Sequence, residues 1–270
     1  MNTETTPPPG SSQAPAPTSL TARLLNIFIA PGEVFDEIKS APHCLQNWLV
    51  PALIFLLASW VGVGVKFSQE SVRHQIEDIQ QVAMQKQFQK YIDSGAMTQA
   101  QVNQAKAGAT RFSTATQMIS IVVIPLFVAG LMPFWGGLIV WAGCRLVFRQ
   151  PLDFMKAVEA AGLPMMIMAA GALVNGLLAA AMGNAFATLG ISLLVKNFDP
   201  SNPMNGFLML LEVFGMWALV IRAVGLAKLS GVSFVKAGAW VFGLWITYMG
   251  GMFGLAWGLQ KLLSTMMGKH

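Results

Sequence analysis

The chain has 270 residues, of which 54% are hydrophobic and only 11% are charged. A soluble domain carries about 25% charged residues, so the composition excludes an ordinary soluble globular protein. The net charge is +5, but the 17 basic residues are spread over loops and the ends of apolar segments, without a basic-aromatic patch for nucleic acid. We therefore expect a membrane protein with no nucleic-acid partner.

The first 40 residues divide into a tail and an amphipathic segment. Residues 1–19 are rich in Pro, Ser, Thr and Ala and carry one charge, which predicts a disordered tail. No basic region precedes a short apolar core there, so no cleavable signal peptide is expected. Residues 20–40 place apolar side chains at helical spacing, and Pro31 restarts the helix. We expect this amphipathic N-terminal helix to lie in the membrane interface, with packing on the bundle as the alternative.

Five apolar segments are each long enough to cross a bilayer, which takes about 20 helical residues. Backbone polar groups in lipid must be hydrogen-bonded within their own segment, so these segments are expected to be helices. The predicted fold class is therefore all-α: a polytopic helical membrane protein with five transmembrane helices. Their approximate limits are 48–67, 118–144, 157–183, 205–227 and 237–262, followed by a C-terminal tail over 263–270.

A polar segment, residues 68–116, separates the first two spans. The Asp-Ser-Gly sequence at 93–95 is typical of a turn that ends a helix. Thr-Gln-Ala-Gln at 98–101 is a capping box that opens the next helix. The segment therefore predicts an extramembrane helical hairpin that extends the first two spans beyond the bilayer.

Two charged bridges join consecutive spans and resemble each other at an offset of 80 residues: LVFRQPLDFMKA (146–157) and LAKLSGVSFVKA (226–237). Asp153 and Ser233 suit the N-cap of the helix that follows each bridge. Lys156 and Lys236 then fall in the first helical turn, where the helix dipole disfavours a cation. We attribute them first to membrane orientation, and otherwise to anionic lipid or an acidic partner. The candidate cytoplasmic lipid or partner contacts are Arg149, Lys156, Lys228 and Lys236.

Short basic loops predict the orientation of a membrane protein. In an arrangement with the N-terminus inside, the outer short segments hold three basic residues, and the outer hairpin adds six. The three are Lys196, Lys261 and Lys269. Cys44 and Cys144 fall on the cytoplasmic side of an N-in, C-out arrangement, where thiols stay reduced and unpaired. That arrangement places eight basic residues inside: Arg23, Lys39, Arg145, Arg149, Lys156, Arg222, Lys228 and Lys236.

A leader that reads PGEVFDEIK (31–39) precedes a first span opening on Trp48 and Pro51, and the last bridge lies in NPMNGFLMLLEVFGMWALVIRAVGLAKLSGVSFVKA (202–237). Over about residues 20–262, the chain resembles a bacterial-type member of the Yip (Ypt/Rab-interacting protein, "Yip-one domain") family of five-span membrane proteins. In the eukaryotic branch, the resemblance implies contact with prenylated Rab-type GTPases and a role in vesicle traffic. The bacterial branch has no generally assigned activity, so Rab-type GTPase binding is not carried over. The resemblance implies the cytoplasmic (inner) membrane of a bacterium.

Glu212 is the sharpest candidate for an intramembrane polar site, because it lies about eight residues into the predicted fourth span. A carboxyl group at such a depth is by default a functional-site hypothesis. It could bind a cation, a proton or the polar head of a ligand. Alternatively, it could be protonated, or bonded to Asn175 or Tyr248, and only hold helices together.

The remaining residues indicate packing rather than chemistry. Neither the three histidines nor the methionines form a metal-ligand set, and no phosphate loop or hydrolase elbow is present. We expect no metal, no cofactor and no enzyme activity. Two rows of small residues are expected to pack internally or, alternatively, to form a homodimer face: Ala172, Gly176 and Ala180 in the third span, and Gly250, Gly254 and Gly258 in the fifth.

These observations predict an integral membrane protein that organises or assists other membrane or envelope components. Its partners would be the lipid bilayer and a membrane protein or a second copy of the chain, contacted through the hairpin and the basic bridges. The alternative is a transporter or channel for a small solute, an ion or a lipid, with Glu212 lining the route.

Overall fold

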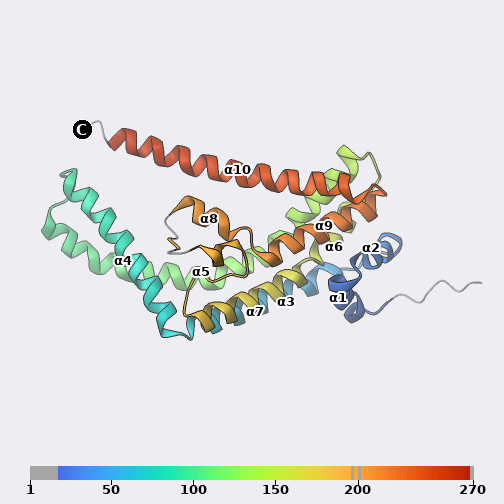
Figure 1. Cartoon of the computed structure of the whole chain (residues 1–270), viewed down its shortest axis with the longest axis horizontal. Helices are drawn as coiled ribbons and strands as arrows, with labels where there is room; N and C mark the ends of the chain where they lie inside the picture. Colours follow the sequence, from blue (N-terminus) through green and yellow to red (C-terminus); the bar gives the residue numbers. More distant parts are fainter. Residues whose placement is uncertain (1–17, 196–197, 200–201, 268–270) are drawn as a thin grey trace, which may run out of the picture.

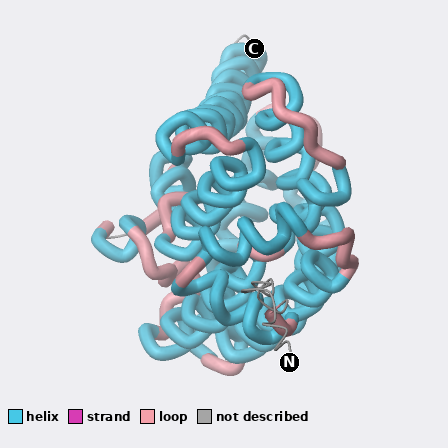
Figure 2. Tube along the Cα trace, turned by 90° about the vertical axis from the view of Figure 1, so that its right-hand side faces the viewer, coloured by secondary structure: helices cyan, strands magenta, loops and turns pink. Residues whose placement is uncertain are grey.

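The computed structural model describes residues 18–195, 198–199 and 202–267 of the chain. Most of the predicted N-terminal tail lies outside these residues. Within them the chain consists of helices joined by loops (Figure 2). In order the elements are α1 (Leu20–Ile29), α2 (Pro31–Ser40), α3 (Gln46–Phe67), α4 (Glu70–Asp93), α5 (Gln99–Ala142), the π-helix η1 (Gly143–Val147), α6 (Phe154–Gly162), α7 (Met165–Met182), the 3₁₀-helix η2 (Ile191–Leu194), α8 (Pro203–Met209), α9 (Val213–Ser230) and α10 (Phe234–Met267).

Five helical segments of the described chain are long and apolar enough to cross a membrane. The first is α3, and the second joins the later part of α5 to η1. The third comprises α6 and α7, the fourth is α9, and the fifth is the first part of α10. The prediction of an all-α fold with five membrane-spanning helices is confirmed. The segments run over Gln46–Phe67, Ile119–Val147, Phe154–Met182, Val213–Ser230 and Phe234–Leu255.

The fourth predicted span and the predicted C-terminal tail differ from the structure. The predicted span 205–227 is interrupted, because α8 ends before Leu210 and α9 begins only at Val213. Hydropathy missed this break, since the two residues before Glu212 are leucines. Near the C-terminus α10 continues to Met267, so residues 263–267 of the predicted tail belong to this helix.

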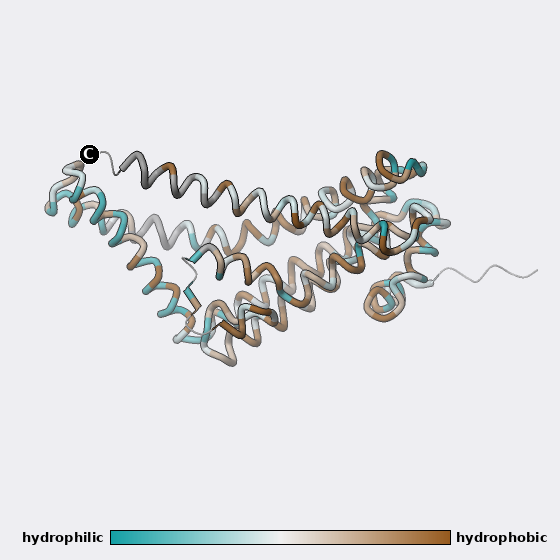
Figure 3. Tube along the Cα trace, turned by 45° about the horizontal axis from the view of Figure 1, so that its top comes forward, coloured by the Kyte–Doolittle hydropathy of each residue, from teal (hydrophilic) through white to brown (hydrophobic). Residues whose placement is uncertain are grey.

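The predicted hairpin consists of α4 and the first part of α5. Gly95 adopts a left-handed conformation (φ 71°) in the turn between them. Thr98 accepts a hydrogen bond from the Gln101 backbone, and the Gln101 side chain bonds the Thr98 N–H in return, which completes the capping box. Figure 3 shows this hydrophilic hairpin projecting from the more hydrophobic spans. We call it the hairpin arm.

The N-terminal leader, α1 and α2, packs on the bundle rather than lying free in the interface. The two helices meet at Pro31, and α2 packs against α9. Phe35 is the largest fully buried side chain, and a Cβ added at Gly225 of α9 would lie 2.9 Å from its ring. The alternative, packing on the bundle, is therefore confirmed for the apolar face, which the protein itself covers. That face consists of Leu24, Ile27, Val34, Phe35 and Ile38.

The two predicted rows of small residues behave differently. A Cβ added at Gly176 of α7 would lie 2.5 Å from the Gly62 carbonyl oxygen of α3, so only glycines permit this approach. The row in the third span therefore packs internally. Around Gly250, Gly254 and Gly258 of α10 an added Cβ would meet nothing within 4 Å. The expectation of internal packing is wrong for this row, because beyond its contact with α9 the helix α10 packs only sparsely, on α8, where Phe253 lies edge-on against Phe207 (Figure 1).

The molecule has two distinct ends (Figure 1). The leader, the α5–α6 bridge and the α9–α10 bridge lie at one end, which we call the leader end. The hairpin tip lies at the opposite end. After the two related bridges the helices start at equivalent residues, Phe154 in α6 and Phe234 in α10.

Candidate functional site

Glu212 stands at the start of a helix and not in its interior. It is the N-cap of α9, and its carboxylate accepts hydrogen bonds from the backbone N–H groups of Gly215 and Phe214, the latter at 3.3 Å. Asn175 Nδ2 donates to the same carboxylate at 3.2 Å. Asn175 Oδ1 in turn accepts from the Leu189 N–H at 2.9 Å, which ties the loop after α7 to the start of α9.

The structure thus brings Glu212 and Asn175 together but leaves Tyr248 apart. Tyr248 lies on α10 with 54% of its surface exposed, and no hydrogen bond among the described residues joins it to Glu212. Both oxygens of the Glu212 carboxylate are already bonded to backbone or amide groups. An N-cap of this kind stabilises a helix by about 1 kcal/mol. The geometry therefore favours the structural role for Glu212.

A second polar cluster, which the sequence analysis missed, lies at the leader end and centres on Glu159 of α6. The Glu159 side chain is only 2% exposed. Its carboxylate accepts hydrogen bonds from the Cys44 backbone N–H at 3.0 Å and from Asn47 Nδ2 at 2.9 Å. Lys156 Nζ lies 3.3 Å from this carboxylate, and His43 Nδ1 lies 3.1 Å from it. A buried carboxylate needs such compensation, because an isolated charge is very costly to bury.

Arg23 extends this cluster into the leader. Its Nη1 donates to Asn47 Oδ1 at 3.1 Å, and its Nη2 forms an ion pair with Glu37 of α2 at 2.9 Å. One chain of polar contacts therefore links α1 and α2 to α3 and α6. We call the members the Glu159 network: Arg23, Glu37, His43, Asn47, Lys156 and Glu159.

Glu37 has a shifted pKa. Burial alone raises the pKa of this carboxyl, but hydrogen bonds from Thr18 and Arg23 and the charge of Arg23 outweigh it and hold the pKa below 4.5. The folded-state pKa is therefore depressed. The ionised Glu37 carboxylate therefore stabilises the fold at a pH above its unfolded-state pKa. This contribution is lost as the pH falls through the folded-state pKa.

Lys156 has a structural reason for its unfavourable place in the first turn of α6. Its Nζ donates to the carbonyl oxygens of Ala41 and Pro42, each at 3.1 Å. These groups follow the C-terminal end of α2, which favours a cation. Asp153 caps α6 as predicted, because its Oδ1 accepts from the Met155 N–H at 2.8 Å. Lys156 thus binds α2 to α6 and is buried, so it is not exposed for lipid or a partner.

The other candidate basic contacts have different surroundings. Arg149 and Lys236 are exposed at the leader end. Lys228 is 42% exposed and forms an ion pair with Asp36 of α2. Its backbone carbonyl accepts a hydrogen bond from Lys39 Nζ at 3.0 Å. Of the four residues, Arg149 and Lys236 are the ones left open to a lipid head group or a partner.

Arg222 lies in the middle of α9 and not at its flank. It is 8% exposed, and its Nε has no hydrogen-bond partner among the described residues. A Cβ added at Gly136 of α5 would lie 3.3 Å from this nitrogen, so the glycine makes room for the guanidinium. Arg222 therefore lies inside the bundle rather than in a bridge or a flank, and the other seven of the eight basic residues lie at the leader end.

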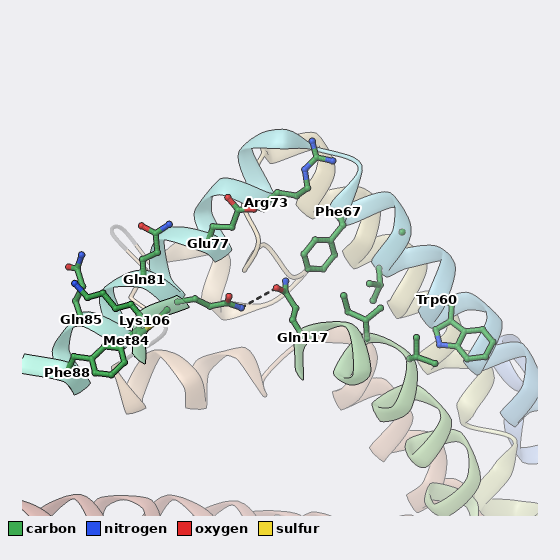
Figure 4. A pocket seen from close by; sticks show the side chains of 15 residues that line it. Trp60, Phe67, Arg73, Glu77, Gln81, Met84, Gln85, Phe88, Lys106 and Gln117 are labelled. Carbon is green, nitrogen blue, oxygen red and sulfur yellow. Dashed lines mark hydrogen bonds between the residues drawn. The ribbon is translucent and has the colours of Figure 1, made fainter. Parts of the chain in front are cut away.

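A cavity of about 980 Å³ lies at the base of the hairpin arm, between α3, α4 and α5 (Figure 4). Its apolar side comes from the end of α3 and from the second span. Its other side comes from α4 and from α5 before that span, and it is polar apart from Met84 and Phe88 of α4. We call it the hairpin-base cavity. It is lined by Trp60, Val63, Gly64, Phe67, Arg73, Glu77, Gln80, Gln81, Met84, Gln85, Phe88, Lys106, Gln117, Ile121 and Val122.

The five apolar helices make the chain a multi-pass membrane protein that lies in a lipid bilayer. A sequence model of the Yip1 domain matches residues 25–268, which is nearly the whole chain. The chain therefore belongs to the Yip1 domain family, and the resemblance to the Yip family is confirmed. Comparison with curated proteins and with solved structures found no match.

We predict that Lys156→Met destabilises the protein by about 3–5 kcal/mol, because Glu159 then stays buried without its cation. Adding Glu159→Gln is expected to recover part of this loss, since the double variant buries no unpaired charge. The free energy of unfolding of the purified protein in detergent measures both effects.

The matched control is Lys236→Met, at the equivalent position of the second bridge, where the lysine is exposed. Its effect is expected to stay within about 0.5 kcal/mol. Equal losses for Lys156→Met and Lys236→Met would mean that the Glu159 network does not hold the leader end together.

Proposed function

We propose that this protein is a non-enzymatic interaction protein that organises or assists other components of the membrane or envelope. In this proposal it lies in the cytoplasmic membrane of a bacterium, with the leader end in the cytoplasm and the hairpin arm outside. Its partner binds the hairpin arm. The proposal does not include binding of Rab-type GTPases.

The observation that carries the proposal is the shape of the hairpin arm. At about 1.5 Å per residue, the 24 residues of α4 extend about 36 Å, far more than a connection between two spans requires. Beyond its base the described part of the arm is polar and mostly exposed, and two of its described hydrophobic side chains are exposed, Val82 (49%) and Tyr91 (42%). Aromatic residues in a polar surface are typical of binding sites for other proteins.

The base of the arm is held firmly, which suits a binding element that must present a fixed surface. Val72 is fully buried. Gln75 Oε1 accepts a hydrogen bond from the Ala185 N–H at 2.7 Å, and this bond joins α4 to the loop after α7. The transport alternative has less support, because the carboxylate it requires, Glu212, is bonded within the fold.

A photoreactive amino acid at Tyr91 is predicted to cross-link one protein reproducibly in intact cells, whereas the same probe at Arg149 does not capture it. The effect of substitutions is measured in a chain that carries the photoreactive amino acid at Gln87. There the double substitution Val82→Glu and Tyr91→Glu is expected to abolish the cross-linked adduct, because it replaces the exposed apolar side chains of the arm by charged ones. Gln81→Glu with Gln89→Glu adds the same charge and is expected to retain it. Loss of the adduct in both pairs, or no reproducible adduct, contradicts the proposal.

The proposed orientation predicts which end reacts with a membrane-impermeant thiol reagent. In spheroplasts of cells producing a chain without Cys44 and Cys144, Ser94→Cys in the hairpin turn is expected to be labelled. Gln150→Cys in the first bridge is expected to be labelled only after permeabilisation, because the basic bridges face the cytoplasm. The reverse pattern would place the hairpin arm in the cytoplasm and contradict the orientation.

A further inference from the structure

We propose that the hairpin-base cavity binds an anionic phospholipid. Its head group lies against the polar side formed by α4 and α5, and one hydrocarbon chain lies along the apolar side formed by α3 and α5. This lipid site is independent of the protein partner proposed above for the hairpin arm.

The position of the cavity relative to the membrane suits a lipid. Trp60, Val63 and Phe67 belong to the last two turns of the first span, and Trp60 lies about 10 Å from the end of α3 at the helical rise. Ile121 lies close to the start of the second span at Ile119. The polar lining from Arg73 onward belongs to the arm. The cavity therefore crosses the boundary between hydrocarbon and water.

The charged and amide groups of the lining gather on one side of the cavity. Arg73 and Lys106 contribute two positive charges, whereas Glu77 contributes one negative charge. Several glutamine side chains, among them Gln81 and Gln85, add amide groups that can donate hydrogen bonds (Figure 4). Guanidinium and ammonium groups bind phosphate oxygens strongly. The polar side therefore suits a phosphate head, and the apolar side suits a hydrocarbon chain.

The cavity is already formed and has room for a ligand. Gln80 Nε2 donates to Gln117 Oε1 at 3.3 Å, which joins α4 to α5 beside the cavity (Figure 4). At Gly64, in its apolar side, an added Cβ would meet nothing within 4 Å. A volume of about 980 Å³ falls within the usual range of ligand sites, about 300–1,000 Å³. A soluble ligand would leave the apolar lining within the membrane unused.

The test uses the full chain in vesicles of phosphatidylcholine that contain a photoactivatable phosphatidylglycerol. Adducts are expected to concentrate on residues 60–67 and 117–122. Gly64→Leu places a bulky side chain in the apolar side of the cavity and is expected to lower adduct formation there about tenfold, the equivalent of about 1.4 kcal/mol. Gly130→Leu is the matched control in the second span, since a Cβ at Gly130 also meets nothing within 4 Å, and it is expected to change nothing.

A second pair of variants tests the head group. Arg73→Gln with Lys106→Gln is expected to remove the preference for phosphatidylglycerol over a photoactivatable phosphatidylcholine, whereas Lys86→Gln with Lys90→Gln, on the same arm but outside the lining, keeps it. Elution as a single peak in gel filtration checks that each variant is folded. Adducts spread evenly over all spans and unchanged by Gly64→Leu would indicate surrounding bilayer lipid only and overturn the proposal. Equal labelling by both lipids in the unmodified protein would overturn the anionic head group.

Discussion

Glu159 is a carboxylate enclosed by helices at the leader end of a membrane bundle, and that end is arranged around the groups that compensate its charge. An unpaired charge in such a place costs several kcal/mol, so its partners have to be held in fixed positions. Lys156 comes from the same helix, Asn47 from α3, and the Cys44 N–H from the loop after α2. Because Arg23 bonds Asn47 and pairs with Glu37, the position of the leader follows from the same requirement.

The two sequence segments that most clearly mark the family contact each other in the structure. Phe35 of the leader packs against Gly225, and Asp36 pairs with Lys228 in the last turn of α9. Lys39 adds a hydrogen bond to the Lys228 carbonyl oxygen. These residues form a packing interface between the leader and the fourth span. Their pattern is therefore explained by the fold and needs no catalytic role.

Local and hydropathic signals were sufficient for most of the architecture. The capping box at Thr98 and the N-cap at Asp153 depend on neighbouring residues only, and both are present as predicted. The spans follow from their hydropathy, which reports length and polarity. Hydropathy does not report a helix break inside an apolar run. For this reason the break before α9, with Glu212 as its N-cap, could not be predicted.

The polar clusters depend on contacts between distant segments. Asn47 and Glu159 are 112 residues apart, and no pattern in a single sequence pairs them. The spacing of Lys156 and Glu159, three residues apart on one helix face, was the one available signal. The hairpin-base cavity had no such signal, because its lining comes from three helices.

The central claim is that the leader belongs to the folded bundle, held by the Glu159 network and by the contact of Phe35 with Gly225. Hydrogen exchange of the backbone amides of α2, with the protein in lipid nanodiscs, tests it most directly. The account predicts that these amides exchange as slowly as those in the second half of α9, and that Gly225→Val, which displaces Phe35, makes them exchange rapidly while α3 and α7 stay protected. Rapid exchange of α2 in the unmodified protein, or protection of α2 that Gly225→Val leaves unchanged, would contradict it.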